Sequence, residues 1–522
     1  MNEKKTMETK TISFQPEWQY PESVSTLRFG SRGAAFLTIL ITLITAVGAG
    51  LIVVVTNGSF MAGTAYLAAI IILFSSIYRL EWGFYIFMGM VLVFDQFPIP
   101  GFMPWTTKVY YFKNLKESPF FPNLGAAVVN PLELQLFLLF IIWFVVLAAQ
   151  RNRRANKIQV WPVALLFFMG IVFSLLYGLK NGGEFLPALW EVRAIFYMGL
   201  LYIFVPQIIQ TKKQVHTLFW VIILAISYKA FQGALRFTVF GFSTGGYETL
   251  TNHEDPVFIL DVLIFLFALV LFQARSNQVY AIILMLLPMV LGFFAGERRA
   301  AYAAIVPTFA GLITILPGDV QKKVFKTSAW VLLFLALYFA AFWNSSSKLG
   351  SPVRLVKSGL SNDRESAGER YYSNLYREYE KYDLAQNVQI NPVVGLGFGR
   401  KYEMPIPLIH IDFTLRDYIP HNEILWLLVK TGGIGFCLFC FFLNSIGFQG
   451  SAIVTKLKDP YLKSVGALAI CAIINQLVVS NYDLQLTYYR NMVFLGTLLG
   501  LLSALQGMDG GDRKVNKSLI YN

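Results

Sequence analysis

Long apolar runs of helical length repeat along the chain and constrain its fold more than any other feature. A run of about 18 or more apolar residues can span a bilayer core roughly 30 Å thick. Because 56% of the 522 residues are hydrophobic and only 14% are charged, the chain needs lipid as its solvent. We count about fourteen such segments, at residues 34–56, 60–78, 82–96, 132–149, 161–179, 194–209, 216–234, 256–274, 279–295, 300–316, 327–344, 423–446, 461–480 and 489–506.

The positive charge between these runs predicts the topology. Cytoplasmic connections of membrane proteins are enriched in Lys and Arg. Every second connection is basic here, which predicts cytoplasmic N- and C-termini and an even number of spans. The same clustering argues against nucleic acid as the reason for the net charge of +13. The basic residues are Arg151, Arg153, Arg154 and Lys157; Lys212 and Lys213; Arg275; Lys322, Lys323 and Lys326; Lys456, Lys458 and Lys463; and Arg513, Lys514 and Lys517.

The expected fold class is all-α: a polytopic membrane helix bundle of about 12–14 transmembrane helices with one large, partly helical periplasmic loop. Residues 1–33 are polar and of mixed charge, unlike a signal peptide. The predicted parts are a cytoplasmic N-terminal tail (1–33), transmembrane helices 1–11 (34–344), the periplasmic loop (345–422), transmembrane helices 12–14 (423–506) and a cytoplasmic tail (507–522).

The long loop itself contains a predicted helix, at residues 366–386. Its tyrosines recur at three- and four-residue spacing and fall near one face: Tyr372, Tyr376, Tyr379 and Tyr382. Two interpretations stay open for this face, aromatic packing at the membrane interface and stacking on sugar rings.

The cysteines give no metal or redox site by their spacing. Cys437-x-x-Cys440 has no second pair, and Cys471 lies in another apolar run. We predict that all three are apolar helix residues. The sequence also contains no metal-ligand cluster of convincing spacing and no phosphate-cradling glycine loop.

Four polar residues are predicted to lie at the outer ends of separate spans. Arg193 follows Trp190-Glu-Val, Arg298 and Arg299 stand in a tight turn, and His421 marks the return of the long loop to the membrane. An arginine near membrane depth costs a few kcal/mol unless it is paired or lines a watery cavity. We therefore expect an outward-facing polar cavity at this level.

These side chains have the chemistry of transfer from a lipid diphosphate. Guanidinium groups bind phosphate oxygens in pairs, and a histidine can accept a proton from a hydroxyl. Simpler interpretations stand beside this one. Arg193 could pair with Glu191 or Glu184, the two turn arginines could anchor helix ends, and His421 could cap a helix. His253 is interpreted as part of a polar loop.

Four segments, in order, resemble O-antigen ligases and O-antigen polymerases. His421-Asn-Glu-Ile-Leu-Trp-Leu-Leu-Val-Lys-Thr-Gly432-Gly-Ile-Gly435 is similar to the signature that ends the large loop of that family. Asn391-Pro-Val-Val-Gly-Leu-Gly-Phe-Gly399 resembles its Pro-x-x-Gly-x-Gly stretch, and Gly296-Glu-Arg-Arg its arginine turn. Arg193-Ala-Ile-Phe-Tyr resembles a fourth segment. Glu297 replaces the usual serine, and about fourteen spans exceed the twelve or so of a ligase.

The resemblance implies a glycosyltransferase C-like membrane enzyme that acts on undecaprenyl-diphosphate-linked glycan without nucleotide sugar, cofactor or metal. It implies diphosphate-binding roles for Arg193, Arg298 or Arg299 and, more weakly, Arg370, and places His421 at the reaction centre. The glycines near Gly395 and Gly432 would be structural. The implied partners are the lipid-linked donor, a glycan or lipid-linked acceptor, membrane lipids and other polysaccharide assembly proteins, but no nucleic acid.

The acceptor stays open. A polymerase would extend another lipid-linked repeat of an O-antigen or exopolysaccharide, whereas a ligase would transfer the chain to lipid A core or protein; the extra spans favour a polymerase. The competing classes are a flippase for the same lipid-linked glycan and a structural scaffold. Charges gather at the predicted outer ends of the spans rather than at mid-span, which favours the enzyme over the flippase.

Overall fold

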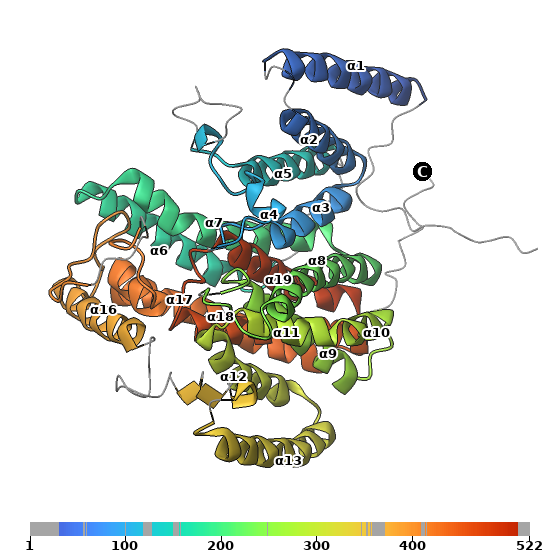
Figure 1. Ribbon diagram of the computed structural model, residues 1–522. Coiled ribbons are helices and arrows are strands. Elements are labelled where there is room, and N and C mark those ends of the chain that lie inside the picture. Colours follow the sequence, from blue (N-terminus) through green and yellow to red (C-terminus); the bar gives the residue numbers. More distant parts are fainter. Residues whose placement is uncertain are drawn as a thin grey trace, which may run out of the picture.

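The computed structural model describes residues 31–509, apart from 56–57, 59, 100, 118–127, 150–155, 157, 248, 346, 351–352, 355, 358–370, 409–412 and 414. In these residues the only β pairing is an isolated bridge between Ile99 and Phe102. The helices run side by side through most of the molecule (Figure 1). They are α1 (Ser31–Val55), α2 (Phe60–Tyr78), α3 (Leu80–Val93), α4 (Trp105–Lys108), α5 (Pro131–Ala149), α6 (Trp161–Lys180), α7 (Phe185–Ile208), α8 (Lys212–Val239), α9 (Asp255–Leu271), α10 (Asn277–Leu284), α11 (Leu286–Ala295), α12 (Arg299–Ile315), α13 (Gly318–Phe342), α16 (Tyr371–Ile390), α17 (Glu423–Lys456), α18 (Pro460–Ser480) and α19 (Tyr489–Met508).

The predicted polytopic helix bundle is confirmed. Each of the apolar segments predicted from the sequence overlaps a helix, and the segment 279–295 is divided into α10 and α11, which are bent by 52°. In the described residues, 8 helices are long and apolar enough to cross a membrane, or 9 if the bent pair is one span. Stretches of α1, α2, α3 and α12 are shorter apolar helices. The chain is therefore a multi-pass membrane protein.

The connections gather at two opposite ends of the bundle, as the alternating charge predicts. At one end, called the α16 end, Arg299 donates to Asn374 of α16 over 2.6 Å. At the other, Lys212 pairs with Asp459 at 2.5 Å, and Tyr461 donates to Gln278 over 2.9 Å. Which end faces the cytoplasm stays a prediction from the positive charge.

Several helix boundaries differ from those expected, among them the starts of α7 and α13. The sixth predicted segment starts at residue 194, but α7 begins at Phe185. Arg193 therefore lies more than two turns inside the helix rather than at its outer end. Glu191 and Arg193 lower the apolar content of this stretch, although both are buried in the structure. Likewise Lys322, Lys323 and Lys326 lie within α13 rather than in the connection before it.

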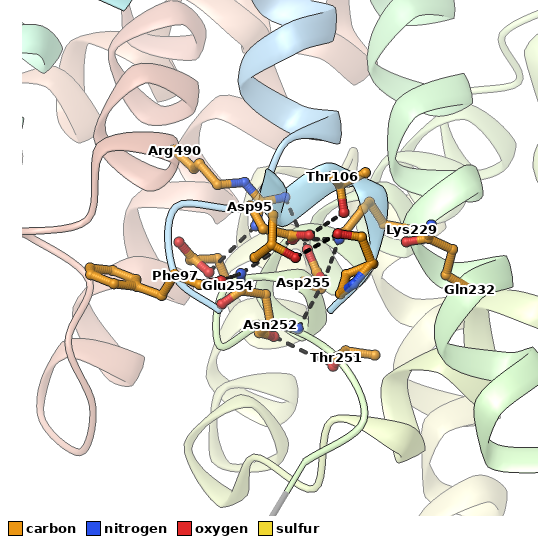
Figure 2. A network of polar contacts seen from close by, with 12 residues as sticks. Asp95, Phe97, Thr106, Lys229, Gln232, Thr251, Asn252, Glu254, Asp255 and Arg490 are labelled. Carbon is orange, nitrogen blue, oxygen red and sulfur yellow. Dashed lines mark hydrogen bonds and ion pairs between the residues drawn. The ribbon is translucent and has the colours of Figure 1, made fainter. Parts of the chain in front are cut away.

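A cluster of buried charges ties four distant segments together near the α16 end (Figure 2). Lys229 of α8 pairs with Asp95 at 2.5 Å and with Asp255 of α9 at 3.5 Å. Arg490 of α19 pairs with Asp255 at 2.9 Å and with Glu254 at 3.4 Å. All five side chains are nearly or fully buried. Because a lone buried charge is far costlier than a paired one, these pairs fix the ends of the helices relative to each other.

Further bonds complete the cluster. Arg490 also donates to the backbone oxygens of Val91 and Leu92, at the C-terminal end of α3. Asn252 donates its side-chain amide to Asp95 over 3.2 Å, and its backbone N–H donates to Asp255 over 3.0 Å. The segment just before α9 is thereby held at the α16 end.

A second buried pair holds the glycine-rich loop that precedes α17. Lys430 of α17 lies 2.7 Å from Glu191 of α7, and both are fully buried. The carboxylate of Glu191 also accepts from the backbone N–H of Gly399 over 2.5 Å. The loop thus threads between α6, α7 and α17, with the N–H of Gly397 donating to the backbone oxygen of Lys430.

The glycines of this loop are structural, as predicted. Gly395 has φ +80°, and a Cβ there would lie 2.4 Å from the backbone nitrogen of Gly432. Gly432 has φ +62° and breaks the helical path of α17. Both positions need the left-handed backbone that glycine adopts without cost, and no side chain fits between the two backbones.

We expect Lys229→Met to destabilise the protein much more than Lys212→Met. Both lysines lie in α8 and form ion pairs at 2.5 Å, but their side chains are 3% and 52% exposed. Removing the buried lysine leaves Asp95 uncompensated and should cost roughly 3–5 kcal/mol, against less than about 1 kcal/mol at the surface. Equal thermal unfolding of the two purified variants in detergent would contradict this account.

We also expect Gly395→Ala to lower the melting temperature, while Gly447→Ala does not. The first change forces a Cβ against Gly432 at positive φ, at a cost of roughly 1–3 kcal/mol. The second lies in α17, where a Cβ would meet nothing within 4 Å, and alanine favours a helix. The measurement is thermal unfolding in detergent; an unchanged Gly395→Ala variant would refute the close approach.

Candidate functional site

The helix α16, predicted within the long loop, joins the arginine turn to the predicted histidine. It spans Tyr371–Ile390, close to the expected 366–386, and lies beside α17 at one end of the bundle (Figure 1). Asn374 of α16 accepts from Arg299, whereas Glu380 contacts His421. Two of the residues singled out from the sequence, Arg299 and His421, therefore contact the same helix.

The arginine turn between α11 and α12 is tight and strained. Glu297, where the resemblance leads us to expect serine, has φ +44°, a left-handed conformation that is uncommon for any residue except glycine. Gly296 packs closely on Pro256, where a Cβ would lie 2.4 Å from the proline ring. The turn thus packs against the start of α9, and this contact fixes the backbone position of Arg298.

Arg298 contacts two groups from other loops. Its Nη2 lies 2.5 Å from Nε2 of His253, and its Nη1 lies 3.6 Å from a carboxylate oxygen of Asp483. Nδ1 of His253 lies 3.8 Å from the same carboxylate. Since the guanidinium donates, His253 accepts through Nε2 and carries its proton on Nδ1. His253, interpreted from the sequence as part of a polar loop, instead supports the arginine.

Asp483 lies in the short loop between α18 and α19, which Glu423 holds in place. The Glu423 carboxylate accepts from the backbone N–H groups of Gln485, Leu486 and Thr487 and from the Thr487 hydroxyl. Burial alone would raise the pKa of Asp483. The nearby His253 imidazole and the charges of Arg298 and Arg377 outweigh it and lower that pKa well below its ordinary value. Asp483 is thus a carboxylate that orients Arg298.

His421 forms a contact pair with Glu380 of α16. Its Nδ1 lies 3.2 Å from Oε1 of Glu380, and its backbone N–H donates to Oε2 over 2.9 Å. Tyr376, one turn earlier in α16, packs edge-on against the imidazole with ring centroids 5.4 Å apart. The side chain of His421 is 26% exposed and that of Glu380 only 2%. A carboxylate on Nδ1 holds the proton there and leaves Nε2 as the proton acceptor.

Arg193 lies apart from this group, in a network of its own. Its guanidinium is 3.0 Å from the carboxylate of Glu133 and donates to Asn114 and to the backbone oxygen of Val128. It is also 3.4 Å from the hydroxyl of Tyr489. The arginine is therefore neutralised by Glu133, rather than by Glu184 or Glu191, the partners considered from the sequence. Its predicted role on a diphosphate remains a prediction.

The fifth predicted site residue, Arg370, lies outside the described residues. In the part of the chain that the structure describes, no group of three or more His, Cys, Asp or Glu side chains could hold a metal ion. The cysteines Cys437, Cys440 and Cys471 are free and lie in α17 and α18, as expected.

Three polar residues of this site were missed or undervalued in the sequence: Glu380, Arg377 and Asp483. In the helix predicted at 366–386, the sequence pattern singles out only the tyrosine face and neither Glu380 nor Arg377. Nothing in the local pattern distinguishes Glu380 from its neighbour Glu378, which is exposed. Their partners lie 41 or more residues away in sequence, so only the folded chain identifies them.

The family model described as O-antigen ligase matches residues 260–440, which run from α9 into α17. The match includes the arginine turn, α16 and the Glu380–His421 pair, whereas Arg193 and Asp483 fall outside it. A search of curated proteins finds no match. The matched residues, three of the four motifs and the helix bundle around them thus make this part of the chain similar to O-antigen ligases.

Proposed function

We propose that this protein is a membrane glycosyltransferase that moves a glycan from undecaprenyl diphosphate to a hydroxyl acceptor, polymerising or ligating O-antigen or exopolysaccharide. The observation that carries the proposal is the pair of sites along α16. Arginines lie at one contact, and a histidine backed by a carboxylate lies at the other. The O-antigen ligase match to residues 260–440 supports the same class of enzyme.

His421 acts as the general base in this proposal. The acceptor O–H loses its proton to Nε2 of His421 as the oxygen bonds to the anomeric carbon. The bond from that carbon to the phosphate oxygen breaks, and its electron pair leaves with undecaprenyl diphosphate. The contact of Glu380 with Nδ1 supports this role, because it fixes the ring and stabilises the imidazolium that forms. His421 then releases the proton to water.

Arg298 and Arg299 bind the diphosphate in this proposal. The leaving group gains negative charge as the bond breaks, and fixed guanidinium groups stabilise that charge without a metal ion. Contacts with His253, Asp483 and Asn374 support the assignment, since they hold both arginines in one place. Arg193 would join them only if the diphosphate displaced Glu133, and Arg370 stays in the proposal as a further contact.

We also propose the location. The charge pattern of the connections favours cytoplasmic termini, and the similarity to O-antigen ligases favours a bacterial inner membrane. The α16 end, with His421 and the arginine turn, would then face the periplasm. The donor would enter from the outer leaflet, and the identity of the acceptor would distinguish a polymerase from a ligase.

The decisive experiment follows transfer by the purified protein. Lipid-linked oligosaccharide extracted from the host's membranes is incubated with the detergent-solubilised enzyme, without nucleotide sugar and with a chelator. We expect longer or transferred glycans from the wild type and none from His421→Ala. If no acceptor gives product, and cells carrying His421→Ala still export glycan, the protein is a transporter of lipid-linked glycan instead.

The variant Glu380→Gln should lower kcat by about 10²–10⁴-fold, with little change in donor KM. A glutamine amide placed on Nδ1 donates a hydrogen bond, so the imidazole proton moves to Nε2, where it blocks the base. The matched control is Glu378→Gln, an exposed residue of the same helix, which should leave the rate unchanged. An equal rate for both variants would exclude Glu380 as the partner of a catalytic histidine.

For the arginine turn, we expect Arg298→Lys to weaken donor binding about tenfold or more. Lysine keeps the charge but loses the planar fork that binds phosphate oxygens and contacts His253 and Asp483 together. Arg275→Lys, at the opposite end of the bundle, is the control and should bind normally. The measurement is the KM for the lipid-linked donor, and the assignment is wrong if that KM is unchanged in Arg298→Lys.

A further inference from the structure

Tyr376 of α16 carries a buried hydroxyl that the proposed mechanism does not use. The residue is 6% exposed, and its hydroxyl has no hydrogen-bond partner among the described residues. A buried polar group without a partner costs about 1–3 kcal/mol. Because its ring packs against His421, this hydroxyl lies next to the reaction centre, where a substrate group could supply the missing bond.

The direction of Tyr376 around α16 differs from that of Arg377. Successive residues of an α-helix are rotated by about 100° around its axis. Viewed down that axis, Glu380 lies between the other two, roughly 40° from Tyr376 and roughly 60° from Arg377. Arg377 faces Asp483, whose pKa its charge helps to lower. His421, held by Glu380, therefore separates two flanks of the helix. One adjoins the arginine turn, and the other is the side of Tyr376.

The charges on the two flanks are different. On the arginine flank, Arg298 and Arg377 lie near the carboxylate of Asp483, and Arg299 contacts α16 at Asn374; this excess of positive charge suits an anion. Beside Tyr376, by contrast, positive and negative charges balance. Arg416 pairs with Asp417 at 3.2 Å, Lys401 pairs with Asp417 at 3.0 Å, and Glu380 adds a further carboxylate. This balanced set of charges gives a diphosphate no net attraction, whereas a neutral sugar does not need one.

The groups beside Tyr376 also match the chemistry of sugar hydroxyls. A sugar hydroxyl both donates and accepts, so it is bound by side chains of both kinds. Burial, with a further contribution from Glu380, raises the pKa of Tyr376 to about 12, so that its hydroxyl keeps its proton and donates. The loop behind it is fixed, since Tyr402 donates to the backbone oxygen of Arg416 over 3.0 Å.

We propose that Tyr376, with Arg416 and Asp417, forms the subsite for the acceptor sugar, on the side of His421 opposite the diphosphate. This inference rests on the proposed function and adds its direction. The leaving group lies toward the arginine turn, and the attacking hydroxyl lies toward Arg416 and Asp417. The Tyr376 hydroxyl donates to an acceptor oxygen next to the one that reacts, and so presents the reacting O–H to Nε2 of His421.

Two probes separate the flanks in the intact, detergent-solubilised protein. Undecaprenyl diphosphate without sugar reports on the arginine flank. The oligosaccharide released by mild acid from the host's lipid-linked precursor, without diphosphate, reports on the Tyr376 side. Binding of each is measured for the wild type, Tyr376→Phe and Tyr382→Phe. Tyr382 lies in the same helix with its side chain exposed, so its change to Phe is chemically matched.

We expect Tyr376→Phe to weaken oligosaccharide binding about five- to tenfold and to leave the binding of undecaprenyl diphosphate unchanged. Tyr382→Phe should bind both probes as the wild type does. Because Phe keeps the ring against His421, an unchanged melting temperature would attribute the loss to the hydroxyl. In the transfer assay, the acceptor KM should rise and the donor KM should not.

Unchanged oligosaccharide binding in Tyr376→Phe, or weaker binding of undecaprenyl diphosphate instead, would overturn the acceptor subsite. A failure of the proposed function would give a different experimental result. In that case the wild type transfers no glycan to any acceptor, while Tyr376→Phe still lowers oligosaccharide affinity, and the flank would bind sugar in a protein that does not join it.

Discussion

The pairing of buried charges is the constraint on which the α16 end of this bundle depends. Lys229 and Arg490 lie deep among apolar helices, where each needs a carboxylate. Asp95 lies 134 residues before Lys229, and Asp255 lies 235 residues before Arg490. The pairs can form only when the end of α3 and the starts of α9 and α19 meet α8 at Lys229, so the cluster fixes these helices relative to one another.

The candidate site lies next to this cluster of buried charges. The segment that ends in Asp255 also carries His253, and the loop before α19 carries Asp483. Both reach Arg298, which the strained turn at Glu297 directs toward them. An arginine held by a neutral histidine and a carboxylate has few conformations left to lose when it binds an anion. Preorganisation of this kind strengthens electrostatic stabilisation of a developing charge.

The second half of the site depends on close backbone approach. Gly395 and Gly432 let the loop after α16 pass against a break in α17, and the Glu191–Lys430 pair holds the loop there. This sets the start of α17 and, two residues before it, His421. Helix α16 contacts both halves of the site, through Asn374 at Arg299 and through Glu380 at His421. The candidate residues Arg298 and His421 thus lie in loops at helix starts, and buried polar contacts anchor these loops to the helices.

The sequence by itself determined the all-helical membrane fold and the grouping of loops at two ends. It also predicted the arginine turn and His421 as candidate site residues. Apolar runs, basic connections and glycine positions are local patterns, and lipid leaves few structures that satisfy them. Only the tertiary structure decided which carboxylate serves which cation. Glu133 pairs with Arg193, and Lys430 pairs with Glu191. Glu380, rather than the exposed Glu378, contacts His421. Such pairings depend on helix rotation and packing between residues 41 to 239 positions apart, which no local spacing encodes.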